Sequence, residues 1–369
     1  MKILYITNQV CGPAGLERVL SIKTRYLIEE YGYDIHILTL NQGDTPLFYD
    51  FHPDIIYHDI AAIGNPITYF SAYRKGLRNV VEMCQPDIIS VCDDGIKGFF
   101  VPKWVSKPCP MIYERHVSQN VEQTTDGQSF VSKFSFTLKK KVMHWGARQY
   151  DAFVVLTEDN TAEWDLENIK VISNPLSFYP EDSSNLDRKV VLAVGRQSFQ
   201  KGYDRMLQSW KIVQDSHPDW QLHIYGKIDP ELQLDAEAKR LGVETSVSFY
   251  PPVKNIQDKY QEASIYVMPS RFEGFGMVLI EAMSCGVPVI SYDCPCGPAD
   301  IITENEDGFL IPNGDIAAFA KAIDQLITDQ SLRQSMGQKA KKNSKRYLPK
   351  HIVPQWHRLF QELYAERQK

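Results

Sequence analysis

Short apolar stretches alternate with longer amphipathic stretches along the whole chain. The apolar stretches are rich in β-branched residues and predict strands. They cover Lys2–Thr7, Asp34–Thr39, Asp87–Val91, Pro110–Tyr113, Ala152–Leu156, Lys170–Ile172, Lys189–Val194, Gln221–Tyr225, Ser246–Phe249, Ile265–Met268, Pro288–Ser291 and Gly308–Ile311. The amphipathic stretches predict helices and include Leu16–Tyr31, Tyr203–Ser216, Pro230–Leu241 and Asp315–Thr328. Helical crossovers of this length imply parallel sheets with both faces covered, an α/β fold of doubly wound type.

The pattern divides the chain into two domains. A second series of strands begins near residue 188, after a segment rich in Ser, Asn and Pro (residues 173–187) that is typical of a linker. We therefore predict an N-terminal domain over residues 1–175, a C-terminal domain over residues 188–349, and an interdomain cleft. The final helix, residues 350–369, has apolar residues at helical spacing and is expected to pack back on the first domain. A chain of 369 residues suits two domains of about 150 residues each.

Composition and charge exclude several classes of protein. The chain is 43% hydrophobic and 23% charged, which is typical of globular proteins and not of disordered ones. A net charge of −6 disfavours a general nucleic-acid binder. No apolar run approaches the roughly 20 residues that span a bilayer, and the N-terminal run is too short for a signal peptide. Seven cysteines without disulfide or zinc spacing then favour a cytoplasmic protein.

The strongest chemical signal is the sequence SRFEGFGMVLIEAMSCG, residues 270–286, directly after a predicted strand. Ligands bind at the carboxyl ends of strands in open α/β sheets. Gly274 and Gly276 allow close backbone approach, and a helix predicted over Met277–Ser284 offers unpaired N–H groups in its first turn. Glu273 and Glu281 lie on either side of this helix start. The alternative for each acid is an ordinary solvated carboxylate.

A second signal is VGRQSFQKG, residues 194–202, after the strand that opens the second series. Arg196 supplies a planar fork of donors and Lys201 a movable point charge, which together suit phosphate binding at a strand end. Taken singly, such residues are usually solvent-facing.

Two weaker signals follow strands of the first domain. Gly15 lies in the turn TNQVCGPAGLER, before an amphipathic helix. Its amide is a candidate to bind a diphosphate at the helix N-terminus. The alternative is a turn that only connects the strand to the helix. This turn does not have the G-x-G-x-x-G pattern, so a nicotinamide dinucleotide site has little support. His116, in YERHVS, is a candidate to hydrogen-bond a substrate, the alternative being a surface or capping residue.

Residues 132–150, SKFSFTLKKKVMHWGARQY, mix basic and aromatic side chains. They predict a basic amphipathic helix that makes peripheral contact with the inner membrane, on its cytoplasmic face. The alternative is an ordinary domain helix with a solvated basic face.

These motifs together resemble those of the retaining glycosyltransferases of family 4, which have the GT-B architecture of two Rossmann-like domains. The segment EGFGMVLIE resembles their E-x7-E motif, with Glu273 and Glu281 at its ends. VGRQSFQKG resembles their G-R-x-x-x-x-K-G element, and Gly15 lies in a turn similar to their N-terminal glycine loop. The PCGP sequence at residues 295–298 resembles a subgroup acting in capsule, exopolysaccharide or lipopolysaccharide assembly.

The resemblance implies a role for each motif. Glu281 would hold the ribose of a nucleotide-sugar donor, and Arg196 and Lys201 its diphosphate, helped by the amide of Gly15. His116 would contact the donor sugar and help stabilise the reacting centre. The sugar hydroxyls would be held by Glu273 and by the backbone of Phe275, Gly276, Met277 and Val278. Uridine is the expected nucleoside, with Val253 near its base.

The expected function is therefore a retaining, metal-independent transfer of a hexose or N-acetylhexosamine from a UDP-sugar. The acceptor would be a saccharide or lipid-linked saccharide in cell-surface polysaccharide assembly. No cofactor and no metal site are expected, because the Asp93-Asp94 pair is not the D-x-D arrangement of metal-dependent transferases. Two alternatives remain: a non-catalytic nucleotide-sugar-binding protein and a UDP-sugar epimerase of the same architecture.

Two positions depart from the family pattern. Ala14 precedes Gly15 where a second glycine is usual, and the sequence Gly226-Lys227-Ile228 lacks the second glycine of the usual G-x-G. Because Ile228 replaces a glycine that allows close backbone approach, this departure disfavours a backbone contact to the donor there.

Overall fold

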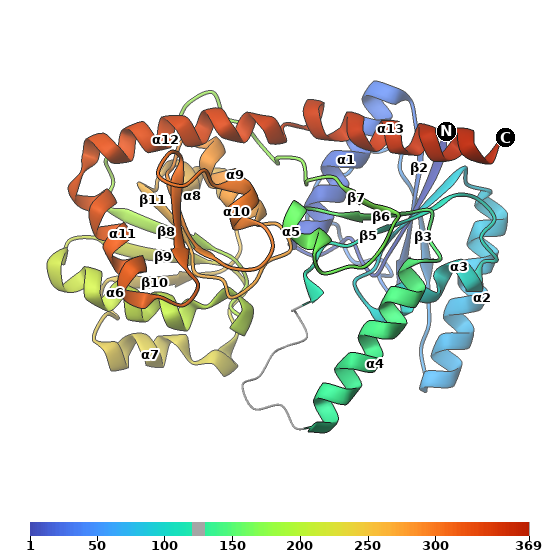
Figure 1. Ribbon diagram of the computed structural model, residues 1–369, viewed down its shortest axis with the longest axis horizontal. Helices are drawn as coiled ribbons and strands as arrows, with labels where there is room; N and C mark the ends of the chain where they lie inside the picture. Colours follow the sequence, from blue (N-terminus) through green and yellow to red (C-terminus); the bar gives the residue numbers. More distant parts are fainter. Residues whose placement is uncertain (120–129, 369) are drawn as a thin grey trace. The chain divides into compact units, whose positions relative to one another are not determined.

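A computed structural model of the chain describes residues 1–119 and 130–368, with the side chains of all of these except residues 130–136. The chain divides into two compact units, shown from blue to red along the sequence in Figure 1. The first unit contains Met1–Val117, residues 130–175 and the C-terminal segment from Pro349. The second unit contains Leu176–Leu348.

The first unit is built on a seven-stranded sheet in which every pair of neighbours is parallel. Its strands are β1 (Lys2–Thr7), β2 (Asp34–Leu40), β3 (Ile56–Ile60), β4 (Ile88–Cys92), β5 (Met111–Glu114), β6 (Ala152–Val155) and β7 (Ile169–Val171). The order across the sheet is β3-β2-β1-β4-β5-β6-β7. The switch point of this sheet, where ligands bind in doubly wound folds, therefore lies between β1 and β4.

Six α-helices accompany this sheet in the described part of the first unit. They are α1 (Gly15–Tyr31), α2 (Pro66–Cys84), α3 (Val101–Trp104), α4 (Phe130–Ala147), α5 (Glu158–Thr161) and α13 (Pro349–Arg367), with the 3-10 helix η1 (Ile96–Phe100) between β4 and α3. The C-terminal helix α13 packs against α1. Its buried Trp356, Leu359 and Phe360 explain why a segment so distant in sequence belongs to this unit.

The second unit repeats the same design with six parallel strands. They are β8 (Val190–Val194), β9 (Gln221–Tyr225), β10 (Val247–Tyr250), β11 (Ile265–Met268), β12 (Val289–Asp293) and β13 (Gly308–Pro312). The order is β10-β9-β8-β11-β12-β13, so the switch point lies between β8 and β11. Its helices are α6 (Tyr203–Ser216), α7 (Leu234–Leu241), α8 (Ile256–Gln261), α9 (Met277–Ser284), α10 (Pro298–Ile301), α11 (Ile316–Thr328) and α12 (Gln330–Ser344), with η3 (Phe199–Lys201), η4 (Pro230–Leu232) and η5 (Lys345–Tyr347).

Burial on both faces explains why the strands are almost wholly apolar. In β11 all four residues are buried. Ile265 and Val267 belong to a core cluster with Trp210 of α6 and Phe319 of α11, and the residues between them point to the opposite face. Helix–helix packing of α6 on α11 and of α9 on α12 completes the layers.

The structure confirms the predicted α/β class with two Rossmann-like units. Several predicted bounds agree with the structure, including those of β1, β9, β11 and α6. The sequence pattern missed β3, an edge strand whose residues are mostly exposed and therefore lack an apolar signature. The helix predicted over Pro230–Leu241 is split, because Gln233 adopts a left-handed conformation (φ 48°) between η4 and α7. In the parts of the chain that the structure describes, no helix is both long and apolar enough to cross a membrane.

Candidate active site

Glu273 and Lys201 meet at the carboxyl edge of the second sheet. Lys201 ends η3, which follows β8, and Glu273 follows the neighbouring strand β11. The Lys201 Nζ lies 2.6 Å from the Glu273 Oε1, and the Ser270 hydroxyl donates to the same oxygen at 2.5 Å. Glu273 is only 5% exposed, so the reading of this residue as a solvated acid is wrong. Two residues predicted separately thus form one ion pair.

The loops that carry this pair are packed against each other. Gly202 follows Lys201 with φ 64°, and a Cβ atom there would lie 2.1 Å from the carbonyl oxygen of Pro269. Arg271, in the loop after β11, also joins the two segments, because its guanidinium binds both carboxylate oxygens of Asp204 in α6 at 2.9 and 2.6 Å. The position of Lys201 relative to Glu273 is therefore fixed by backbone packing as well as by charge.

The helix α9 begins immediately after this loop. Gly276 precedes it with φ 100°, a conformation that L side chains rarely adopt. The N–H groups of Met277 and Val278 lie in the first turn, where an α-helix offers no internal acceptor. Both residues are partly exposed, whereas Phe275 is buried against Tyr347 at 5.6 Å between ring centroids. The start of α9 thus presents donors at the sheet edge that carries Glu273.

Glu281, one turn further along α9, is 1% exposed. It accepts hydrogen bonds from the Ser177 hydroxyl to Oε1 at 2.8 Å and from the Tyr260 hydroxyl to Oε2 at 3.1 Å. The solvated alternative for Glu281 is also wrong. Ser177 belongs to the segment predicted as a linker, and sequence reasoning identified neither hydroxyl.

Arg196 and Val253 follow β8 and β10, on the same edge of the sheet. The side chain of Arg196 is exposed and forms no ion pair with any residue that the structure describes. A Cβ at Gly226 would lie 2.0 Å from the carbonyl oxygen of Gly195, so the loops after β8 and β9 touch. Their contact is reinforced by Gln197, whose N–H donates to the Lys227 carbonyl at 2.9 Å. Val253 is partly buried, and no hydrogen bond links it to the Glu273 group.

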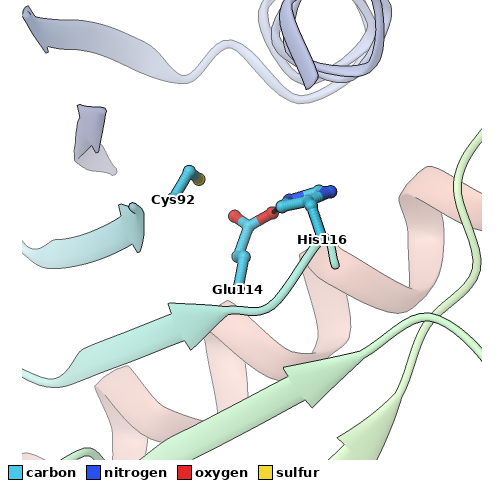
Figure 2. A group of neighbouring side chains, drawn as sticks. All are labelled: Cys92, Glu114 and His116. Atoms are coloured by element: carbon cyan, nitrogen blue, oxygen red, sulfur yellow. Dashed lines mark hydrogen bonds and ion pairs between the residues drawn. The ribbon is translucent and has the colours of Figure 1, made fainter. Parts of the chain in front are cut away.

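In the first unit, Gly15 is the exposed first residue of α1, and a Cβ there would meet nothing within 4 Å. Open space therefore lies beside this backbone. His116 follows β5, and its side chain is only 7% exposed, which excludes a freely solvated surface role. Its Nε2 lies 3.2 Å from the Glu114 Oε2 (Figure 2). Its backbone N–H donates to the Asp94 Oδ1 at 3.3 Å.

Behind His116 lies a buried ion pair that sequence reasoning missed. The Lys23 Nζ lies 2.7 and 2.6 Å from the two carboxylate oxygens of Glu114, and both residues are at most 1% exposed. The Ser90 hydroxyl also donates to the Glu114 Oε1 at 2.6 Å. Burial opposes ionisation of Glu114, but Lys23 and His116 outweigh it and lower the pKa of the carboxyl from 4.5 to about 2.

Cys92, Glu114 and His116 have potential metal-ligand atoms within 4.8 Å of one another (Figure 2). The rest of their surroundings does not suit a metal. The ammonium of Lys23 already occupies both Glu114 oxygens, and burial together with the Glu114 charge raises the pKa of the Cys92 thiol well above its ordinary value. A thiol that stays protonated is a poor ligand, so we assign no metal to this cluster.

Asp93 and Asp94 have separate partners. Asp93 accepts from the Asn8 side chain at 3.1 Å and from the Gly95 N–H at 2.8 Å, and burial raises its pKa. Asp94 pairs with Arg115 at 3.6 Å. Both carboxylates are therefore engaged in holding the loop after β4.

Helix α4 carries the described part of the predicted membrane segment. Met143 and Ala147 are buried, and a Cβ at Gly146 would lie 2.4 Å from the Cβ of Phe99, so one face packs closely on η1. Leu138, Lys141 and Trp145 are exposed on this helix. The side chains of residues 132–136, also part of the predicted segment, lie outside the described residues.

Two Rossmann-like units, each with chemistry-bearing residues at the carboxyl edge of its sheet, define an α/β protein of the two-domain Rossmann-like type. Residues 179–343 match the family described as Glycosyl transferases group 1. An uncharacterized glycosyltransferase of Haemophilus influenzae is 30% identical over 365 residues, covering 96% of this chain and 98% of the relative. The amylovoran biosynthesis glycosyltransferase AmsD of Erwinia amylovora is 30% identical over 370 residues, with coverage of 96% and 98%. The chain belongs to the group 1 glycosyltransferases and is an enzyme of that class.

Solved structures extend the likeness to the fold of the whole chain. The crystal structure of Anabaena HepE in complex with UDP-glucose superposes with a TM-score of 0.78 at 20% identity. The superposition covers 98% of this chain and 100% of the HepE chain.

Proposed function

We propose that this glycosyltransferase moves a hexose or N-acetylhexosamine from a UDP-sugar, with retention and without a metal, to a saccharide or lipid-linked saccharide of a cell-surface polysaccharide. The observation that carries the proposal is the group formed by Lys201, Glu273 and the start of α9, with Glu281 buried four residues into the helix. The capsular polysaccharide biosynthesis glycosyltransferase CapM of Staphylococcus aureus, 28% identical over 220 residues, supports a polysaccharide product. The UDP-glucose bound to HepE supports the donor.

Each part of this group suits one part of such a donor. The carboxylate of Glu281 already accepts two hydroxyl hydrogen bonds, from Ser177 and Tyr260, and in the proposal it takes ribose hydroxyls as well. Lys201, Arg196 and the first-turn N–H groups of α9 face the diphosphate. Glu273 takes a sugar hydroxyl, with its orientation fixed by Ser270. In the first unit, Gly15 and His116 are the residues that the family resemblance assigns to the donor.

The chemistry follows from the charge that develops during transfer. As the bond from C1 to the diphosphate oxygen breaks, negative charge grows on the leaving oxygen and the sugar becomes oxocarbenium-like. Fixed donors aimed at that oxygen stabilise the transition state more than the ground state. Arg196, Lys201 and the α9 amides supply this stabilisation in the proposal. The acceptor hydroxyl then attacks the same face that the leaving group departs from and gives its proton to the departing diphosphate oxygen.

A donor screen tests the proposal. UDP-glucose, UDP-galactose and their N-acetylated analogues are incubated with the protein, with GDP- and ADP-glucose as comparisons, in EDTA and in magnesium. Release of free UDP from one UDP-sugar, equal in both buffers and strongly reduced in Lys201→Met but not in Lys211→Met, is the expected result. Because water is the acceptor in this screen, it is repeated with a saccharide acceptor, and absence of nucleotide release from every donor in both forms contradicts transfer.

The same screen separates the alternatives. A UDP-sugar converted to another UDP-sugar without release of UDP identifies an epimerase, and a donor that binds without reaction identifies a binding protein. Once a product has been isolated, the NMR coupling constant of its anomeric proton gives the stereochemistry of transfer. Inversion of the anomeric configuration contradicts the retaining assignment.

We propose in addition that the first unit contacts an anionic membrane through α4 and the neighbouring α3. Lys103 stacks on the Trp145 ring at 4.4 Å, and Trp145 is 37% exposed. Next to them, a groove is lined by residues that include Phe70, Arg74 and Arg78. Exposed cations beside aromatic rings are typical of surfaces that bind the headgroup region of anionic lipids.

Co-sedimentation with vesicles tests this contact. Vesicles that contain phosphatidylglycerol should pellet the wild-type protein more than pure phosphatidylcholine vesicles do. The variant Lys103→Glu with Lys141→Glu should lose the difference, whereas Lys321→Glu with Lys339→Glu, an equal charge change in the second unit, should keep it. Equal pelleting of all three proteins removes the membrane contact and leaves the donor chemistry untouched.

A further inference from the structure

The buried ion pair Lys23–Glu114 contacts His116, a residue that the proposed function assigns to the donor sugar. Lys23 lies in the middle of α1 and is fully buried, and Glu114 is the last residue of β5, two residues before His116. A buried ion pair is a weak source of stability, because desolvation of both charges offsets their attraction. Its contacts therefore suggest a role beyond stability.

The carboxylate of Glu114 is surrounded by donors. Lys23 donates to both oxygens, Ser90 donates to Oε1, and the His116 Nε2 faces Oε2. An ionised carboxylate can only accept hydrogen bonds. The ring nitrogen of His116 that faces Glu114 must therefore carry a proton, and this requirement selects one tautomer of the neutral imidazole.

The ammonium of Lys23 is held from its other side by aromatic rings. It lies 3.9 Å from the ring centroid of Trp356 on α13 and 4.9 Å from that of Tyr5 on β1. Cation–π contacts of this kind stabilise a desolvated ammonium. A chain of contacts therefore runs from α13 through Lys23 and Glu114 to His116.

The second ring nitrogen of His116, Nδ1, has a different environment. No hydrogen bond joins Nδ1 to any residue within the described ranges, and the side chain retains 7% exposure. The carboxyl of Glu17, at the first turn of α1, interacts electrostatically with His116, and its Oε2 is buried without a hydrogen-bond partner. Among the described residues, the charged groups around the ring are thus Glu114 with Lys23, Glu17, and Asp94, which accepts from the His116 backbone.

We propose that Lys23 and Glu114 are positioning residues that hold His116 in the Nε2-protonated tautomer and leave Nδ1 as the ring atom that meets the substrate. Glu114 fixes the orientation of the ring, and Lys23 keeps Glu114 ionised and in place. The catalytic consequence rests on the proposed function, whereas the tautomer is a property of the protein alone.

Nitrogen NMR of the ligand-free protein labelled with 15N-histidine tests the tautomer directly. His116→Gln assigns the His116 signals by their disappearance. Once His116 is titrated to its neutral form, we expect Nε2 to have the shift of a protonated nitrogen and Nδ1 that of an unprotonated one. The opposite tautomer, or the mixture that a solvated histidine shows, overturns the proposal even if the enzyme is active.

Glu114→Gln tests the carboxylate, because an amide can donate as well as accept and no longer selects a tautomer. We expect mixed tautomers at His116 and a loss of turnover on the order of 10²-fold, the size typical of disturbing one preorganised hydrogen-bonding group in an active site. The KM for the donor should change much less than kcat. Unchanged tautomer and kcat contradict a positioning role for Glu114.

The double variant Lys23→Met with Glu114→Gln separates positioning from folding. It replaces the ion pair by neutral side chains of similar size, so the protein should fold even if Lys23→Met alone does not. We expect urea stability close to that of the wild type, with the tautomer preference and turnover still lost. Recovery of turnover together with stability shows that the pair is only structural and overturns the proposal. If no donor reacts with the wild type, the NMR result still decides the tautomer.

Discussion

The two units each contain a lysine–glutamate pair at the carboxyl edge of a sheet, and the two pairs differ in their access to water. In the second unit, the side chain of Lys201 is 19% exposed and that of Glu273 is 7% exposed. In the first unit, the corresponding values for Lys23 and Glu114 are 0% and 1%. An accessible pair can exchange its partner for a ligand, whereas a sealed pair holds its neighbours in place. The same two residue types therefore serve binding in one unit and positioning in the other.

The largest expected effect is on stability when each pair loses its cation. Lys23→Met leaves Glu114 buried without its charge partner, and we expect a loss of about 3–5 kcal/mol in the free energy of unfolding. Lys201→Met leaves the buried Glu273 with the Ser270 hydroxyl, and because the Lys201 side chain is 19% exposed, water can take the place of the ammonium. The loss should therefore be smaller, about 1–3 kcal/mol. Urea unfolding of both variants measures the difference. Equal losses in the free energy of unfolding contradict the distinction between an accessible and a sealed ion pair.

The second prediction concerns Arg196, an exposed cation in the loop between β8 and Lys201. Arg196→Ala should lower kcat by roughly 10²–10³, equivalent to about 2.7–4 kcal/mol, because one preorganised donor to the leaving diphosphate is removed. Arg240→Ala, which removes an exposed arginine from α7, serves as the control. Wild-type turnover in Arg196→Ala across the donors tested shows that its assigned role is wrong.

The third prediction uses pH to examine the sealed pair. The pKa of Glu114 falls from 4.5 to about 2 on folding, so its ionised form stabilises the protein above about pH 4.5, and this contribution disappears as pH falls toward 2. Glu114→Gln has no such contribution. The gap in unfolding free energy between wild type and variant should therefore shrink on acidification, by up to about 3 kcal/mol at roughly 1.36 kcal/mol per pKa unit. A gap independent of pH between 7 and 3 contradicts the lowered pKa.

The smallest expected effect is at Ser177, which donates to Glu281. Ser177→Ala removes one hydrogen bond to a buried carboxylate, and UDP should bind more weakly by a factor of about 10, or roughly 1.5 kcal/mol. Ser216→Ala, at an exposed serine that ends α6, should have no effect. Unchanged affinity in Ser177→Ala indicates that Ser177 does not support Glu281 in donor binding.

Some features could be predicted from sequence because they depend on local signals. The helix α9 has the bounds expected from the glycines before it and the apolar run within it. The ion pair between Lys201 and Glu273 could not be predicted as a contact, since the residues are 72 positions apart. Each was nevertheless a candidate, because each follows a strand that ends at the same edge.

Other features had weak or misleading signals. Lys23 lies four residues after Val19 and four before Leu27, both buried, so it interrupts the apolar stripe of α1. The interruption of the apolar stripe was a sequence signal for a buried lysine. Because lysines on helices are usually solvated, it did not lead to that prediction. Ser177 lies in a segment whose composition is typical of a linker, and only the structure shows that it contacts Glu281. Local composition does not reveal such long-range contacts.

Calorimetric titration of UDP in EDTA tests the central claim that the accessible edge of the second unit binds the donor nucleotide without a metal. We predict binding at one site per chain, unchanged when magnesium replaces EDTA, weakened at least tenfold in Glu281→Ala and unaffected in Glu306→Ala, a change at an exposed acid of the same unit. Binding that requires magnesium, or that is equal in the wild type and Glu281→Ala, contradicts the account.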